Sequence, residues 1–212
     1  MHRTLLARPY AADMVDEALE ETVSAAIHAL QGPRYGIGDA LDQVPHVAGL
    51  YAIWADAGTW QMLGLKAPLP PKPLYVGKAE RSLVSRDLKT HFRTSKTGSS
   101  TVRRSFAALL RDSLDLHAVP RNLVRPERPA NFGLPPEEDE RLTRWMHESL
   151  TLATWAKKGK QRLDEIETAV LARWQPPLNL SKVAQASRRL KLAREAMAAE
   201  AHAWAEGRGF DI

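Results

Sequence analysis

A glutamate interrupts the apolar stripe of a helix that the sequence predicts over residues 160–174. The residues on that side of the helix are Leu163, Glu167, Val170, Leu171 and Trp174. An unpaired buried carboxylate costs free energy, so Glu167 needs a partner, which can be a metal cation, an arginine or several amides. Mg²⁺ binds proteins through few carboxylates together with water and substrate phosphates. Glu167 is therefore a candidate ligand for Mg²⁺ or Mn²⁺, and a structural ion pair with an arginine is the alternative.

Two tyrosines lie close to glycines in two short hydrophobic segments. The segments are Gly49-Leu50-Tyr51-Ala52-Ile53-Trp54 and Leu74-Tyr75-Val76-Gly77-Lys78. A phenol, with a pKa of about 10, is a poor general base unless a neighbouring cation lowers that pKa. Lys78 directly follows the second motif and could do so. Tyr51 or Tyr75 with Lys78 could therefore orient or activate a water molecule, and ordinary packing within a sheet is the alternative.

Positive charge is concentrated between residues 78 and 111, where nine basic residues stand against two acidic ones. The net charge of this segment, +7, exceeds the +5 of the whole chain. Such clustering is typical of proteins that bind the phosphate backbone of nucleic acids, and a solvated basic surface is the alternative. The candidate contacts here and in a second basic run are Lys89, Arg93, Lys96, Arg103, Arg104, Arg188 and Arg189.

The composition is that of a globular chain able to bury a core. Its 212 residues suffice for one or two domains, with 44% hydrophobic and 26% charged residues. The absence of cysteine excludes disulfides, thiolate zinc sites and cysteine nucleophiles, so any metal must bind through oxygen or imidazole ligands. We expect a cytoplasmic protein without membrane contact, because no stretch is apolar and long enough for a signal peptide or a membrane span.

Hydrophobic periodicity and turn residues indicate helices with three short strands between them. The helices are expected at residues 11–30, 82–92, 101–110, 137–149, 160–174 and 183–205. The strands are expected at residues 47–55, 73–77 and 150–155. The remaining predictions are a turn-rich connector at residues 36–39, an N-cap at residues 98–100 and a proline-rich loop at residues 117–136.

The motifs together resemble the GIY-YIG endonuclease superfamily over residues 46–182. Gly49-Leu50-Tyr51 and Tyr75-Val76-Gly77 correspond to the Gly-Ile-Tyr and Tyr-Ile-Gly strands that give the superfamily its name. Glu167 matches the glutamate that binds the single divalent metal there, and Asn179 matches an asparagine beyond the end of the same helix. The 23 residues between Tyr51 and Tyr75 are most similar to the spacing in the restriction enzymes of this superfamily.

The resemblance also implies an arginine on the helix after the second strand, where its guanidinium neutralises the scissile phosphate. Arg86 is the closest match, and His91 matches a histidine that follows the arginine. The pattern departs from that of many members, because Asp87 directly follows the arginine and His91 comes five rather than four residues after it.

The resemblance implies an α+β fold, with a small three-stranded, mostly antiparallel sheet flanked by helices. It implies an N-terminal helical extension (residues 1–45), a nuclease core (residues 46–182) and a C-terminal helix (residues 183–212). The implied activity is that of a metal-dependent endonuclease in which Arg86 holds the phosphate, His91 assists proton transfer and Asn179 fixes the local geometry. DNA is favoured over RNA as the substrate, in restriction or genome defence, and a homodimer would cut both strands.

Other function classes stay open. A nucleic-acid-binding module could keep the fold and lose turnover, and the departure at Asp87 favours that alternative. An RNA nuclease would show the same motifs. An interaction protein that assembles through its terminal helices requires only the amphipathic ends of the chain.

Overall fold

The fold is built on a four-stranded antiparallel sheet with the strand order β1-β4-β2-β3. The computed structural model describes residues 8–84, 86–122 and 131–208. The strands are β1 (Tyr35–Gly36), β2 (Gly49–Trp54), β3 (Tyr75–Ala79) and β4 (Thr151–Ala156). The predicted α+β class is confirmed, and the predicted count of three strands is wrong by one. The additional strand is β1, whose Gly36 lies in the predicted connector, because a strand of two residues carries no alternating pattern.

β2 is the central strand of this sheet, and all six of its residues are buried. Its side chains alternate between the two faces, as in any strand. Tyr51 and Ile53 join the larger hydrophobic cluster, whereas Leu50, Ala52 and Trp54 join the smaller one. The sequence of β2 is a continuous apolar run because helices cover both faces of this strand.

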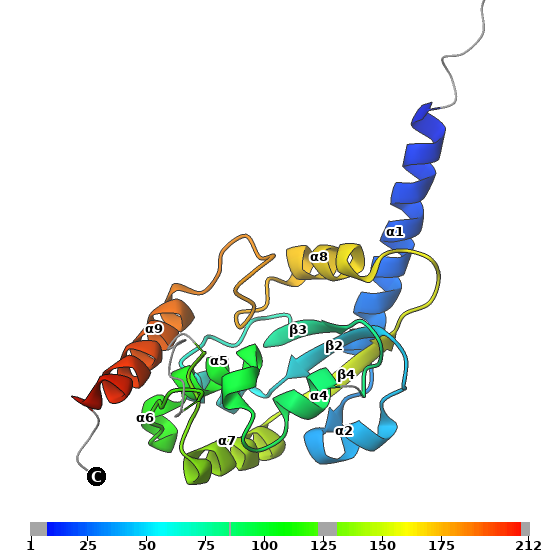
Figure 1. The fold of residues 1–212 in the computed structure, drawn as a ribbon. Helices are drawn as coiled ribbons and strands as arrows, with labels where there is room; N and C mark the ends of the chain where they lie inside the picture. Colours follow the sequence, from blue (N-terminus) through cyan, green and yellow to red (C-terminus); the bar gives the residue numbers. More distant parts are fainter. Residues whose placement is uncertain (1–7, 85, 123–130, 209–212) are drawn as a thin grey trace, which may run out of the picture.

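The smaller cluster lies between the sheet and two helices, α1 (Arg8–Gln31) and α8 (Leu163–Trp174). Figure 1 shows the N-terminal end of α1 projecting from the body of the molecule. Against the other face lie α2 (Ile37–Gln43), α4 (Arg86–His91), α5 (Thr101–Leu109) and α7 (Pro136–Ser149). Within the described residues, no helix is both long enough and apolar enough to cross a membrane.

The remaining helices lie at the surface and between the main elements. They are α3 (Ala57–Met62), η1 (Thr97–Ser99), α6 (Arg111–Leu114), α9 (Arg188–Ala203) and η3 (Trp204–Arg208). α9 packs on α5 at the end of the molecule opposite α1 (Figure 1).

Two predicted helices begin four or five residues later than expected, and each has a local cause. The helix expected at residues 82–92 contains only α4, because the Leu83 amide donates to the Val47 carbonyl and holds that segment beside the sheet. The helix expected from residue 183 begins at Arg188, where the Ser187 hydroxyl accepts a hydrogen bond from the Leu190 amide as an N-cap. Within the predicted loop, residues 123–130 lie outside the described residues, and Pro136 already belongs to α7.

Gly49 is required by a close approach between backbones. It faces Ala156 in the register of β2 and β4, and a Cβ at this position would collide with the Trp155 carbonyl oxygen. Because that oxygen belongs to the neighbouring backbone, a strand would have to move to accept any side chain here.

We predict that Gly49→Ala lowers the free energy of unfolding by about 1–3 kcal/mol, the usual cost of overpacking. Gly38→Ala is the matched control, because a Cβ at Gly38 in α2 meets no atom within 4 Å. That variant should be neutral or gain up to about 1 kcal/mol from the higher helix propensity of alanine. Urea denaturation followed by circular dichroism measures both values, and equal stabilities would contradict the prediction.

Candidate active site

Three of the predicted site residues meet on the face of the sheet that carries the larger cluster. Tyr51 from β2, Tyr75 from β3 and His91 from the end of α4 form a compact ring cluster. The ring centroids lie 6.1 Å apart for the tyrosines, 5.9 Å for Tyr51 and His91, and 6.4 Å for Tyr75 and His91. A hydrogen bond of 2.7 Å joins Tyr51 Oη to His91 Nε2. The structure thus couples the first tyrosine to the histidine.

Gly77 explains why a tyrosine and a glycine recur together in these strands. Tyr51 and Gly77 are direct partners across β2 and β3. A Cβ at Gly77 would collide with the Tyr51 phenol, including its hydroxyl. The missing side chain at Gly77 therefore lets the Tyr51 ring lie across the edge strand and reach His91.

His91 is held in its neutral form. Burial and the nearby Arg103 guanidinium together lower the pKa of His91 to about 4, so the imidazole carries no charge at neutral pH. Its second nitrogen, Nδ1, lies 2.7 Å from Ser100 Oγ. Both ring nitrogens of His91 therefore contact hydroxyl groups.

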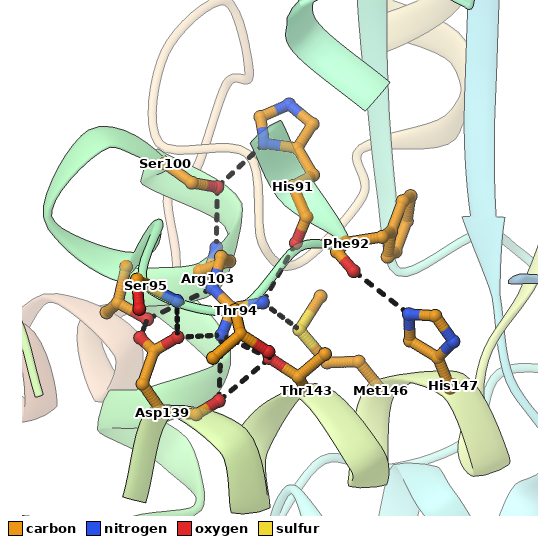
Figure 2. A network of polar contacts seen from close by, with 11 residues as sticks. His91, Phe92, Thr94, Ser95, Ser100, Arg103, Asp139, Thr143, Met146 and His147 are labelled. Carbon is orange, nitrogen blue, oxygen red and sulfur yellow. Dashed lines mark hydrogen bonds and ion pairs between the residues drawn. The ribbon is translucent and has the colours of Figure 1, made fainter. Parts of the chain in front are cut away.

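Arg103 lies at the centre of a buried polar network beneath His91 (Figure 2). Its side chain is 0% exposed and pairs with Asp139 of α7 at 2.9 Å. The guanidinium also donates to the His91 carbonyl oxygen at 3.3 Å and to Thr97 Oγ1 at 3.0 Å. Thr143 accepts a further hydrogen bond at 2.9 Å. The prediction that Arg103 contacts nucleic acid is therefore wrong, because its donors are already bound inside the protein.

Arg104 is also buried, and its guanidinium donates to the carbonyl oxygens of Thr97 and Gly98. Desolvation lowers its pKa to about 10, so it stays charged at neutral pH. Its predicted role as a phosphate contact is likewise wrong, because the side chain stabilises a loop.

Glu167 is buried in α8, only 8% exposed, as its place in the apolar stripe indicated. Its partner in the structure is Lys182, whose Nζ donates to Glu167 Oε2 at 2.6 Å. The residue that pairs with Glu167 is therefore a lysine and not the arginine of the alternative interpretation. Within the described part of the chain, no three histidine, aspartate or glutamate side chains gather into a metal-binding cluster. A single carboxylate is nevertheless the donor set that suits Mg²⁺ when water and substrate phosphate complete the shell.

Asn179 binds the backbone of the edge strand. Its Oδ1 accepts from the Val76 amide at 3.0 Å, and its Nδ2 donates to the Val76 carbonyl at 2.8 Å. The neighbouring Leu178 amide donates to the Leu74 carbonyl at 3.0 Å. The segment after α8 therefore pairs with the open edge of β3 and holds the motif that carries Tyr75.

A family model described as the GIY-YIG catalytic domain matches residues 49–196, which is more than half of the chain. The chain belongs to the GIY-YIG family. It is therefore a nuclease of the endonuclease type, and its substrate is nucleic acid. No curated protein and no solved structure gives a significant match. The matched span of the GIY-YIG domain contains Tyr51, Tyr75, His91, Glu167 and Asn179.

Lys78 lies on the opposite face of β3 from Tyr75, toward α8. It pairs with Glu80 at 2.5 Å, and Glu80 first, with smaller contributions from Glu167 and Asp164, raises the pKa of Lys78. Lys78 is therefore linked electrostatically to Glu80 and, more weakly, to Glu167, and its effect on a tyrosine stays a prediction. Tyr75 and Lys78 stand three residues apart in β3. The ring cluster of Tyr51, Tyr75 and His91 is therefore separated from Lys78 by about 10 Å along this strand.

An open groove of about 600 Å³ lies beside Lys78, between β3, β4 and the start of α8. Four cations line it, Lys78, Lys157, Lys160 and Arg162, against the two acids Glu80 and Asp164. Lys157, Lys160 and Arg162 are not among the predicted contacts, because they follow a strand far from the basic run in the sequence. They lie in one groove with Lys78 only because the segment between β4 and α8 runs beside the end of β3.

The other predicted contacts lie in three places. Arg86 begins α4, and its side chain is outside the described residues. Lys89 and Arg93 are exposed and Lys96 is half-buried, on α4 and in the loop after it. Arg188 and Arg189 are exposed on α9. The convergence of Tyr51, Tyr75 and Arg86 around Glu167 stays a prediction.

We predict that Asp139→Ala lowers the free energy of unfolding by about 3–5 kcal/mol, because it leaves the Arg103 charge buried without its partner. Asp164→Ala is the control, because Asp164 pairs with an Arg162 side chain that is 71% exposed. Its loss should cost no more than about 1 kcal/mol. Urea denaturation compares the two variants, and a small, similar change in both would show that the Arg103–Asp139 pair is not a structural requirement.

Proposed function

We propose that this GIY-YIG domain is a divalent-metal-dependent DNA endonuclease in which Tyr51 is the general base. The observation that carries the proposal is the 2.7 Å hydrogen bond between Tyr51 and a neutral histidine, in a domain that also buries the carboxylate of Glu167. A base must lie within hydrogen-bond reach of its water, and the Tyr51 hydroxyl reaches the edge of the sheet because Gly77 leaves room for it.

In this proposal Tyr51 takes a proton from the water that attacks the phosphorus. Negative charge on the Tyr51 oxygen before that transfer is stabilised by the hydrogen bond with His91. Tyr75 packs against both rings and limits their movement. His91 acts as a neutral hydrogen-bonding group, since its lowered pKa makes it a weak proton acceptor.

Glu167 would hold Mg²⁺ or Mn²⁺, with water and a phosphate oxygen as further ligands. A bound ion would stabilise charge on the phosphate and on the leaving oxygen. In the structure Lys182 pairs with the Glu167 carboxylate, and its ammonium group would have to move away for a metal ion to bind. The partly exposed side chain of Lys182 allows that movement. Arg86 is proposed to neutralise the scissile phosphate, and Asn179 keeps β3 in register with the segment after α8.

We also propose that the groove beside Lys78 receives the phosphate backbone of the substrate. One of its lysines, Lys78, has a pKa that is raised in part by Glu167, the proposed metal ligand. Lys89, Arg93 and Lys96 would contact the backbone on the other side of His91. The family resemblance supports DNA rather than RNA as the substrate. It also supports a role in restriction or genome defence and a homodimer that cuts both strands.

A binding module without turnover is the second candidate. The ion pair between Glu167 and Lys182 favours it, because the lysine ammonium neutralises the carboxylate in place of a metal. The two candidates differ in whether Mg²⁺ makes the protein cut the nucleic acid that it binds.

We predict that Glu167→Gln keeps the fold and DNA binding but slows cleavage at least about a hundredfold, because the metal contributes several kcal/mol of charge stabilisation. Glu165→Gln, an exposed position on the same helix, should cleave at the wild-type rate. The assay is cleavage of plasmid, single-stranded DNA and RNA with Mg²⁺ or with chelator. Wild-type cleavage by the Glu167 variant would refute the metal assignment, and binding without any wild-type cleavage would favour the binding module.

We predict that Lys157→Ala with Lys160→Ala weakens binding to all DNA sequences alike. Because each phosphate contact releases counterions, the log–log slope of affinity against salt should flatten by about two units. Arg188→Ala with Arg189→Ala removes the same charge from α9 and should change the slope little. If the α9 pair carries the loss instead, the DNA crosses the site from that end of the molecule.

A further inference from the structure

Ser100 links the active-site histidine to the start of helix α5. Its hydroxyl is the N-cap of α5 and accepts a hydrogen bond of 3.1 Å from the Arg103 amide. The same oxygen lies 2.7 Å from His91 Nδ1. Ser100 is only 1% exposed, so water cannot easily replace either partner.

The direction of the hydrogen bonds follows from the donors that each group has. A backbone amide can only donate, so the Arg103 N–H uses one lone pair of Ser100 Oγ. The serine hydrogen then needs an acceptor, and His91 Nδ1 is the acceptor that the described residues offer it. If Nδ1 carried the hydrogen instead, the buried serine hydrogen would be left without a partner there, which costs about 1–3 kcal/mol.

A neutral imidazole has one protonated nitrogen. With Nδ1 accepting from Ser100, the hydrogen sits on Nε2, which then donates to Tyr51 Oη. The chain of hydrogen bonds runs in one direction, from the Arg103 amide through Ser100 and His91 to Tyr51. Each bond in such a chain polarises the next one, and the last donor points at the oxygen that the proposed mechanism needs as a base.

We propose that Ser100 is the positioning residue of this active site: it selects the Nε2-protonated tautomer of His91, which stabilises negative charge on Tyr51. The role resembles that of the third group in other activated sites, which orients a histidine rather than touching substrate. The assignment rests on the proposed function for its catalytic consequence, but the tautomer itself is a property of the protein without substrate.

The buried Arg103–Asp139 pair keeps this chain in place. The Arg103 side chain donates to the His91 carbonyl at 3.3 Å, while its amide donates to Ser100 Oγ at 3.1 Å. One residue therefore holds both ends of the Ser100–His91 contact, as Figure 2 shows. Asp139 fixes the guanidinium from α7 and also accepts from the Ser95 amide. The histidine ring and its serine partner cannot shift independently.

The first test is the tautomer of His91 in the wild-type protein without nucleic acid. A long-range ¹H–¹⁵N spectrum of protein with labelled histidines distinguishes protonated from unprotonated ring nitrogens, and His91→Gln identifies the His91 signals. The expected result is a protonated Nε2 and an unprotonated Nδ1 at neutral pH. A protonated Nδ1 would overturn the proposal whether or not the protein cuts DNA.

The second test compares three substitutions at Ser100. Ser100→Thr keeps the hydroxyl, so the tautomer and the cleavage rate should stay close to wild type. Ser100→Asp keeps an N-cap but offers only acceptors, which places a hydrogen on Nδ1. Ser100→Ala removes both interactions and leaves the two tautomers of His91 in exchange.

The single-turnover cleavage rate at saturating DNA should fall about tenfold or more for Ser100→Ala and Ser100→Asp, the lower range for loss of general-base assistance. The DNA affinity of both variants should stay unchanged, because Ser100 touches no substrate. If Ser100→Asp cleaves at the wild-type rate while Nδ1 of His91 is protonated, the catalytic part of the proposal is overturned. Loss of cleavage in Ser100→Thr with the wild-type tautomer would do the same.

Discussion

The buried ion pair between Arg103 and Asp139 is the interaction on which the arrangement of the candidate active site depends. Both charges are removed from water, so they are tolerated only while every donor of the guanidinium finds an acceptor. Those acceptors lie on α7, on the loop that contains Thr97, and on the His91 backbone. The position of His91 thus depends on the packing of α7, a helix that contributes no residue to the site itself.

A steric constraint completes this arrangement. Tyr51 belongs to the central strand, yet its hydroxyl must reach the edge of the sheet, and it does so over the bare backbone of Gly77. Asn179 holds the same edge strand from the other side through both polar groups of Val76. Because the strand is fixed from two directions, a phenol on a neighbouring strand can be placed against a histidine to within a hydrogen-bond length.

The chemistry of the domain is divided between the two faces of that edge strand. Tyr51 and His91 form a neutral, hydrogen-bonded pair on one face, and Glu167 lies among the charges of Lys182 and Lys78 on the other. A neutral histidine beside the tyrosine and a cation-neutralised carboxylate are both states that a protein can bury without large cost. The proposed phosphate and metal would bring the two sets of groups into one reaction.

The sequence by itself determined the family, the strands around Tyr51 and Tyr75, and the burial of Glu167, because these depend on local periodicity and on motifs a few residues long. It also identified the N-cap at residues 98–100, a local backbone property. Only the tertiary structure showed that Ser100 contacts His91, that Lys182 pairs with Glu167, and that Lys157 and Lys160 line one groove with Lys78. The count of basic residues predicted nucleic-acid contacts for Arg103 and Arg104, both of which are buried. The sequence does not distinguish an arginine that binds phosphate from one that pairs with a buried aspartate. Which partner a charge meets is decided by the packing of distant helices, and no local pattern contains that information.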